Sequence, residues 1–250
     1  MVSHYSLGSI IYGFKLYGKL SSREFKQFMI TVVKLGFLIG FSDKRPTTKM
    51  DSYYLFFMLF SMATAALAIF IKIFIQRFFL YKFGYNPDYE YSINSLLIGV
   101  VLIFATSGFV WFLPSGTSTA TLLQSERLGK WRMGLKHVEH ARALVFGIVG
   151  LVLFTIILKF FVTPNSVFLS HMMKVNMAIA FYSLLPTPES DGIYIFFGGY
   201  RWLWVFTLAF VIFSAVLLKL LQSPIAVMFG AAGIAAVAAI ITSWKWGTAA

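Results

Sequence analysis

Long apolar runs separated by short polar connections make up most of the chain. Seven runs approach or exceed the ~20 residues that a helix needs to cross a membrane. Lipid offers no hydrogen-bond partners to an open backbone, so each run is predicted to be a helix. The fold class predicted is therefore all-α, a polytopic transmembrane bundle of about six to seven membrane helices. The predicted helices cover residues 21–41, 53–75, 93–113, 141–162, 168–185, 201–221 and 224–241.

The N-terminal part of the chain differs from the apolar runs that follow it. Residues 1–23 alternate aromatic and basic side chains, which predicts an interfacial segment, and residues 24–250 are predicted to form a single transmembrane domain. Ser21 and Glu24 have the spacing of a capping box and predict a helix start. Lys34 interrupts this helix, so we expect it to lie against other helices or to extend its ammonium to the membrane surface.

The longest polar connection, residues 115–140, is basic. It is predicted to be a cytoplasmic loop, because short cytoplasmic loops carry an excess of lysine and arginine. The same rule places it on the same side of the membrane as the basic connection between the first two helices. The residues counted are Arg127, Lys130, Arg132 and Lys136 in the long loop, and Lys44, Arg45 and Lys49 in the other.

Composition supports the membrane class and excludes several functions. Hydrophobic residues make up 59% and charged residues 12% of the 250 positions, whereas a soluble domain has about 25% charged residues. The net charge of +12 comes from scattered basic residues in short loops, which favours contact with anionic lipid headgroups over nucleic acid. The chain has no cysteine, which excludes disulfides, thiolate metal sites and cysteine nucleophiles.

An acidic, proline-containing turn at residues 184–192 is the main candidate for chemistry. A carboxylate at the end of a membrane helix is costly and is by default a functional-site hypothesis. Asp191 is therefore considered as a relic metal ligand, a proton-relay group, or a cation site together with Glu189. The favoured interpretation is simpler: Ser190 or Asp191 caps the following helix through its free amide groups.

Four short motifs along the chain occur in the order and spacing of a known family. They are Ser-Arg-Glu-Phe at 22–25, Tyr-Lys-Phe-Gly-Tyr at 81–85, Phe-Leu-Pro-Ser-Gly at 112–116, and the turn at 184–192. From Ser21 to Phe197 the chain resembles an archaeal-type member of the site-2 protease family, the intramembrane zinc metalloproteases. The resemblance implies a prokaryotic cell membrane, and a zinc site made of two histidines one helical turn apart, an adjacent glutamate base and a distant aspartate.

The residues needed for zinc chemistry are missing at the matching positions. Lys72, Ile73 and Gln76 stand where the family has its first histidine, its glutamate and its second histidine. An ammonium repels a dication, isoleucine accepts no proton, and a glutamine amide is a weak ligand. We therefore expect neither catalytic residues nor a cofactor, and identify the chain as a degenerate, inactive homologue.

His137 and His140 form a second candidate metal site. Histidines at i and i+3 can share a helical face and chelate a metal weakly. The favoured interpretation is a solvated junction between loop and helix, in which Glu139 neighbours basic residues. No third ligand lies nearby in the sequence.

Three functions follow from these patterns. The favoured one is a structural or accessory subunit that binds other integral membrane subunits, consistent with an aromatic content of 18% and 28 phenylalanines. The alternative is a small transporter or ion-conducting protein that uses buried charges, namely Asp191, Glu189, Lys72 and Lys34. The third is a surviving protease whose metal is held by His137, His140 and Asp191.

Overall fold

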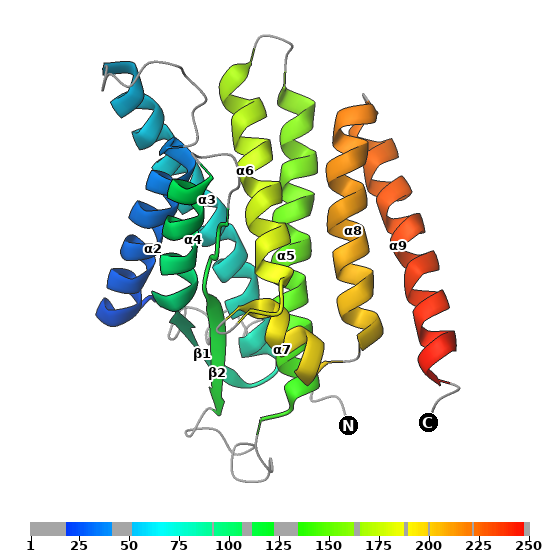
Figure 1. Ribbon diagram of the computed structural model, residues 1–250. Coiled ribbons are helices and arrows are strands. Elements are labelled where there is room, and N and C mark those ends of the chain that lie inside the picture. The colour runs from blue at the N-terminus through cyan, green and yellow to red at the C-terminus, as the bar shows by residue number, and fades with distance from the viewer. Residues whose placement is uncertain are drawn as a thin grey trace.

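The computed structural model is a helical bundle with a small two-stranded sheet at one end (Figure 1). It describes residues 19–41, 52–91, 93–106, 112–122, 135–162, 166–187, 190–199, 201–221 and 223–247. The helices are α2 (Ser22–Phe41), α3 (Ser52–Lys82), α4 (Ile93–Ala105), α5 (His137–Leu158), α6 (Val167–Leu184), α7 (Asp191–Gly198), α8 (Arg201–Leu220) and α9 (Pro224–Gly247). The strands are β1 (Tyr85–Glu90) and β2 (Thr117–Leu122), and a 3-10 turn, Lys159–Phe161, follows α5.

The prediction of a helical membrane protein is confirmed. Within the described residues, four helices are long and apolar enough to cross a membrane: Leu55–Lys82, His137–Phe161, Val167–Leu184 and Arg201–Leu220. A shorter apolar helix covers Pro224–Ile240. These findings support a membrane-embedded bundle, whereas six to seven crossings stay a prediction.

The third predicted helix is shorter than its apolar run. It was expected over 93–113, but α4 ends at Ala105 after 13 residues, a length of about 20 Å that falls short of a crossing. Residues 112–116 are extended and buried. They run back along α4, since a Cβ added to Gly99 would lie 2.8 Å from the carbonyl oxygen of Phe112. The sequence pattern did not reveal this return, because α4 and the returning segment are both apolar and together look like one long run.

Because α4 is short, the described residues that flank the two basic connections lie at opposite ends of the bundle. The end of α2 packs on the start of α3, where Gly40 faces Met58, and α5 starts at the other end of the bundle (Figure 1). Tyr85, just after α3, donates a hydrogen bond to Glu139 in the first turn of α5. The prediction that the two basic connections share one side is therefore wrong for the described residues that flank them. The chain returns through 112–116 instead of crossing once more.

Part of the predicted loop 115–140 is a strand. β2 pairs antiparallel with β1, from Tyr85 opposite Leu122 to Glu90 opposite Thr117. Gly116 enters β2 with a φ of 72°, and a Cβ there would lie 2.6 Å from the carbonyl oxygen of Glu90. Only glycine adopts this conformation without strain. The loop prediction is wrong for Thr117–Leu122, and three of the loop's basic residues, Arg127, Lys130 and Arg132, lie outside the described residues.

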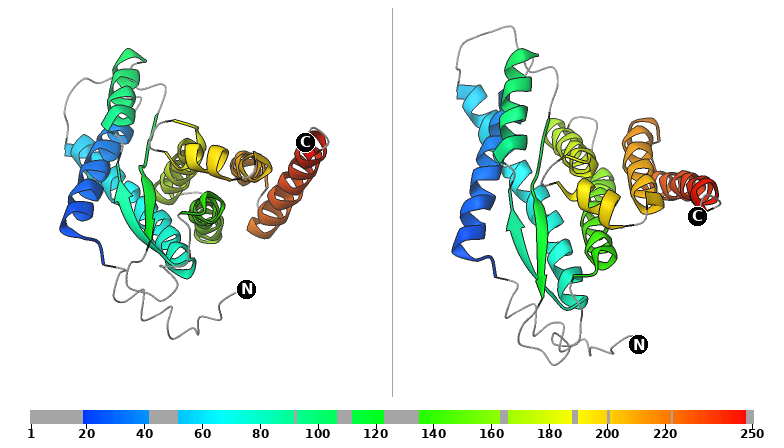
Figure 2. Two further views of the ribbon diagram at one scale, coloured as in Figure 1. Left: turned by 90° about the horizontal axis from the view of Figure 1, so that it is seen from below. Right: turned by 60° about the horizontal axis from the view of Figure 1, so that its bottom comes forward.

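The bundle has a central group of helices and a peripheral pair. The larger of two clusters of buried apolar side chains extends from α2 to α9. Figure 2 shows α9 on the outer side of α8, away from the sheet and from α2. The central group contains the sheet, α3, α5 and α7, and most of the buried polar side chains of the described residues lie among these elements.

The capping box predicted at the start of α2 is confirmed and has a second function. The Ser21 amide donates to Glu24 Oε2 at 2.7 Å, and the Glu24 amide donates to Ser21 Oγ at 3.2 Å. The same carboxylate accepts hydrogen bonds from Arg77 Nη1 on α3, at 2.8 Å, and from the Tyr89 amide on β1, at 3.0 Å. Glu24 thereby joins α2, α3 and the sheet.

We expect Glu24→Gln to lower the free energy of unfolding by about 3–5 kcal/mol at pH 7, because it leaves the buried Arg77 guanidinium without a counter-charge. Burial by itself raises the pKa of Glu24, but hydrogen bonds from Ser21 and Arg77 and the charge of Arg77 hold that pKa below its ordinary value of 4.5. This stabilisation is present above about pH 4.5 and is lost as pH falls through the lower folded-state pKa. Thermal unfolding in detergent at pH 7 and pH 3 measures both effects.

The control is Glu90→Gln, a neighbouring carboxylate on β1 for which we expect a change within about 0.5 kcal/mol. Asp88 also lies near, and burial and the charge of Glu24 raise its pKa, so all variants are compared at the same two pH values. A Glu24→Gln protein as stable as the control at pH 7 would contradict the role of this carboxylate.

Candidate functional site: a buried lysine–aspartate pair

Three residues singled out in the sequence meet at one point inside the bundle. Lys72 and Gln76 lie one turn apart on α3, and Asp191 is the first residue of α7. Lys72 Nζ and Gln76 Nε2 each lie 2.9 Å from the same oxygen, Asp191 Oδ2. All three side chains are fully buried. Residues more than 110 positions apart in the sequence thus form one polar cluster.

The Lys72 ammonium is fully hydrogen-bonded. Besides Asp191, it donates to Ser115 Oγ at 2.6 Å and to the Gly116 carbonyl oxygen at 2.9 Å. These three acceptors match the three N–H donors of an ammonium group. Ser183 Oγ lies further away, at 3.5 Å, and its closer partner is Ser115 Oγ at 2.7 Å. The cluster therefore has no spare donor on Lys72.

Gln76 connects the pair to the sheet. Its amide nitrogen donates to Asp191, and its Oε1 accepts a hydrogen bond from Ser118 Oγ on β2 at 2.8 Å. This fixes the orientation of the amide. The backbone of β2 is held in turn by His140, whose Nε2 donates to the Ser118 carbonyl oxygen at 2.7 Å.

Two glycines allow the backbones around the pair to approach closely. A Cβ added to Gly147 on α5 would lie 2.3 Å from Gln76 Cγ and 2.9 Å from the Lys72 carbonyl oxygen. A Cβ added to Gly192 on α7 would lie 2.2 Å from the carbonyl oxygen of Leu184. Any larger residue would push α5 or α7 away from its neighbour.

The capping interpretation of the acidic turn is wrong. Ser190 occupies the N-cap position of α7 but makes no capping hydrogen bond, and its hydroxyl donates instead toward the carbonyls of Leu185 and Thr187. Asp191 faces across the bundle to α3. Its second oxygen, Oδ1, has no hydrogen-bond partner among the described residues. Glu189, the other acidic residue proposed here, lies outside the described residues.

His137 and His140 are separated by their environments although both lie in the first turn of α5. His137 is exposed, whereas His140 is buried and donates to the backbone of Ser118. The prediction of a solvated junction is therefore wrong for His140. Glu139 accepts a hydrogen bond from Tyr85 at 2.8 Å. The described part of the chain brings no three His, Cys, Asp or Glu residues together as metal ligands.

Zinc does not fit the cluster around Asp191. Lys72 is cationic where a ligand with a lone pair is needed, and Gln76 directs its amide N–H toward Asp191. Asp191 is therefore the single anionic ligand available, its Oδ2 is already bonded to Lys72 and Gln76, and its unpartnered Oδ1 alone does not hold a zinc ion. Ile73, the residue between them on α3, is buried and apolar and cannot act as a base.

The other charge proposed for transport lies elsewhere. Lys34 is half-buried on α2 and is not among the residues that contact the Lys72–Asp191 pair. Two buried pairs, Lys72–Asp191 and Arg77–Glu24, are each compensated locally. A continuous path of charges is not observed among the described residues.

Comparison of the chain with protein-family models, with curated proteins and with solved structures finds no match. The function has to be argued from the geometry of this buried pair.

Proposed function

We propose that this protein is a non-catalytic, site-2-protease-like membrane protein that acts as a structural or accessory subunit of a larger membrane complex. One observation carries the proposal: the Lys72 ammonium lies 2.9 Å from Asp191 at the point where three motif positions meet. In this proposal an internal ion pair takes the place that the metal has in the enzymes that the chain resembles.

The convergence of positions 72, 76 and 191 supports the family resemblance. Two residues at i and i+4 on a long helix and one acidic residue from a distant turn form a three-ligand zinc site in many hydrolases. The three positions were aligned with the family motifs from the sequence alone. In the structure, Lys72 and Gln76 both donate to one carboxylate oxygen of Asp191. A pairing this distant in sequence is not required by helix packing in general.

The chemistry of the cluster favours a structural role. A buried ion pair with all ammonium donors satisfied is costly to rearrange, since separating it leaves a charge in a low-dielectric interior. Such a pair holds α3, α7 and the start of β2 in a fixed arrangement. The same property makes a mobile proton or ion carrier less suited to this site.

Exposed apolar surface supports contact with other membrane subunits or with lipid. α4 is too short to cross the membrane, yet its outer face is apolar. Its exposed side chains are Leu97, Ile98, Val101 and Phe104. A short apolar helix of this kind is suited to packing against a neighbouring subunit. The neighbour would cover the end of α4, which would otherwise face lipid.

Purification from native membranes in mild detergent tests the proposal. We expect partner membrane subunits at a fixed molar ratio, no stoichiometric zinc in protein prepared without chelators, and no proton or solute flux in liposomes. A folded Lys72→Met/Asp191→Asn variant should retain the same partners at the same ratio, because the pair acts within the fold and not in a reaction.

Three outcomes would overturn this function. Flux that is abolished by Asp191→Asn would establish the transporter alternative. One zinc per chain together with peptide cleavage would establish an enzyme. A protein that is monomeric in native membranes, measured by cross-linking, would exclude the accessory role.

A further inference from the structure

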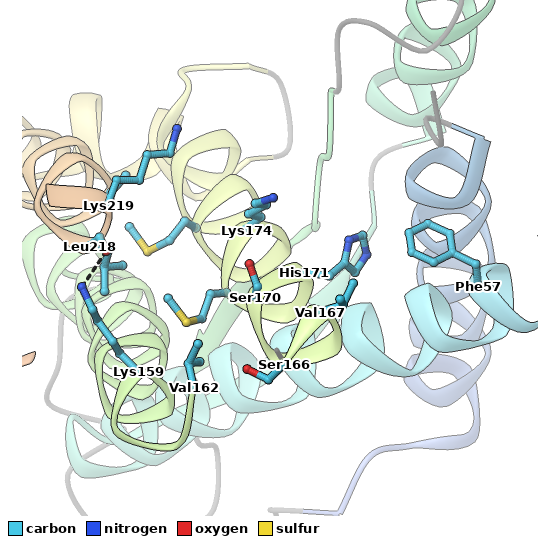
Figure 3. A pocket seen from close by; sticks show the side chains of 13 residues that line it. Phe57, Lys159, Val162, Ser166, Val167, Ser170, His171, Lys174, Leu218 and Lys219 are labelled. Atoms are coloured by element: carbon cyan, nitrogen blue, oxygen red, sulfur yellow. Dashed lines mark hydrogen bonds between the residues drawn. The ribbon is translucent and has the colours of Figure 1, made fainter. Parts of the chain in front are cut away.

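A second polar feature lies at the opposite end of the bundle from the sheet. It is a groove of about 1050 Å³ between α3, the end of α5, the start of α6 and the end of α8 (Figure 3). None of the residues around Asp191 lines it. Any function of this groove is therefore independent of the Lys72–Asp191 pair.

Three lysines from three different segments line the groove. Lys159 lies in the 3-10 turn after α5, Lys174 on α6 and Lys219 in the last turn of α8 (Figure 3). No carboxylate is among the lining residues that the structure describes. The described acidic residues lie elsewhere, in the sheet, at the starts of α2 and α5 and in the central pair: Glu24, Asp88, Glu90, Glu139 and Asp191.

The three lysines differ in their hydrogen bonds and in their exposure to solvent. Lys159 donates to the backbone carbonyls of Leu218, at 2.6 Å, and Leu221, and so caps the end of α8. Lys174 and Lys219 are both exposed. Lys174 lies seven residues into a membrane-spanning helix, about 10 Å below its start. Three lysines at one opening, with no carboxylate among the described lining residues, favour the binding of an anion there.

The rest of the lining is what a phospholipid would contact. Ser166 and Ser170 add hydroxyls near the opening, and Met173, Met177 and Ala215 form an apolar wall further along α6 and α8. Phosphate oxygens are good acceptors for ammonium and hydroxyl donors. An acyl chain is apolar like the methionine wall, and flexible methionine side chains adapt their shape to irregular apolar ligands.

We propose that this groove binds an anionic phospholipid. The headgroup phosphate lies between Lys174 and Lys219, with Lys159 behind them, and one acyl chain runs along Met173 and Met177. The apolar wall favours a lipid over a soluble phosphate compound, which would leave that wall exposed to water. The site is a defined one, in contrast to general attraction of a basic protein to an anionic membrane.

Native mass spectrometry of the detergent-purified, delipidated full-length protein tests the proposal. Phosphatidylglycerol and phosphatidylcholine with identical acyl chains are titrated separately. We expect wild-type protein to bind one phosphatidylglycerol at least tenfold more tightly than phosphatidylcholine. In Lys174→Gln/Lys219→Gln we expect phosphatidylglycerol binding to weaken about 25-fold, because each lysine contributes about fivefold. Lys159 is left unchanged, since it also holds α8.

The matched control is Lys26→Gln/Lys136→Gln, two exposed lysines at the other end of the bundle, which should bind phosphatidylglycerol as the wild type does. Thermal unfolding without lipid checks that both double variants are folded. Equal weakening in both double variants would show general attraction and overturn the site. Inorganic phosphate or glycerol 3-phosphate that displaces the lipid at equal concentration would overturn the lipid assignment in favour of a soluble ligand.

Discussion

Lys72→Met is expected to lower the free energy of unfolding by about 3–5 kcal/mol, because it leaves the Asp191 carboxylate buried without a positive partner. Asp191 would retain one hydrogen bond, from Gln76, which does not replace a full charge. For a protein whose total stability is about 5–15 kcal/mol, this loss is large. Thermal and denaturant unfolding of the purified protein in detergent measure it.

Removing both charges should restore much of the lost stability. In Lys72→Met/Asp191→Asn the asparagine keeps the shape of the aspartate and can still accept from Gln76. We expect the double variant to be more stable than Lys72→Met by about 2 kcal/mol, since replacing a whole buried pair costs far less than breaking it. Lys82→Met, an exposed lysine at the end of α3, serves as the control and should change stability by less than about 0.5 kcal/mol.

The unfolding free energies of these variants show whether Lys72 and Asp191 act as an ion pair or as two independent polar residues. If the stability losses of Lys72→Met and of Asp191→Asn, each measured alone, simply add in the double variant, Lys72 and Asp191 do not interact as the structure shows. If Lys72→Met is as stable as the Lys82→Met control, the pair does not hold the bundle together.

The second large effect is a gain of metal binding. Lys72→His/Gln76→His places two imidazoles one turn apart on α3, both directed at Asp191. Two histidines and one carboxylate are a common zinc set, with ligand distances of about 2.0–2.2 Å. We expect this variant to bind one zinc per chain, measured by elemental analysis after removal of excess metal. Binding should raise the unfolding free energy by about 2.7 kcal/mol when free zinc is a hundredfold above its dissociation constant.

Asp191 provides the control for this experiment. Lys72→His/Gln76→His/Asp191→Asn lacks the anionic ligand and should retain zinc poorly, with little change in thermal stability when zinc is added. Equal zinc content in the two variants would mean that positions 72, 76 and 191 do not form a common site. We expect no peptide cleavage in either, because Ile73 still supplies no general base.

Part of the fold could be read from the sequence, because long apolar runs in lipid have only the helix available to them. The starts of α2, α6, α8 and α9 were predicted to within a residue or two, and the Ser21–Glu24 capping box follows from local spacing alone. α4 was overextended and β2 was missed. The available sequence signals of paired strands were the alternation of Tyr85, Pro87 and Tyr89 with polar residues in β1 and the threonines of β2.

The site could be predicted only by position. The motif spacing singled out Lys72, Gln76 and Asp191, but their mutual contact was not expected, and Asp191 was assigned to a helix cap. Ser118 and His140, which fix the cluster from the sheet and from α5, were missed as partners. Their roles depend on β2 lying beside α3 and α5, which no local pattern encodes.

The sequence by itself determined the class of protein, most of its helices and the residue types at positions 72, 73, 76 and 191, because hydrophobic length, caps and residue type are local properties. The tertiary structure decided that Lys72 compensates Asp191, that α4 turns back without crossing, and that three lysines share one groove. Each of these depends on which helices are neighbours in space. That choice is set by close approaches such as Gly147 to Gln76 and Gly192 to Leu184, and by the need to pair every buried charge.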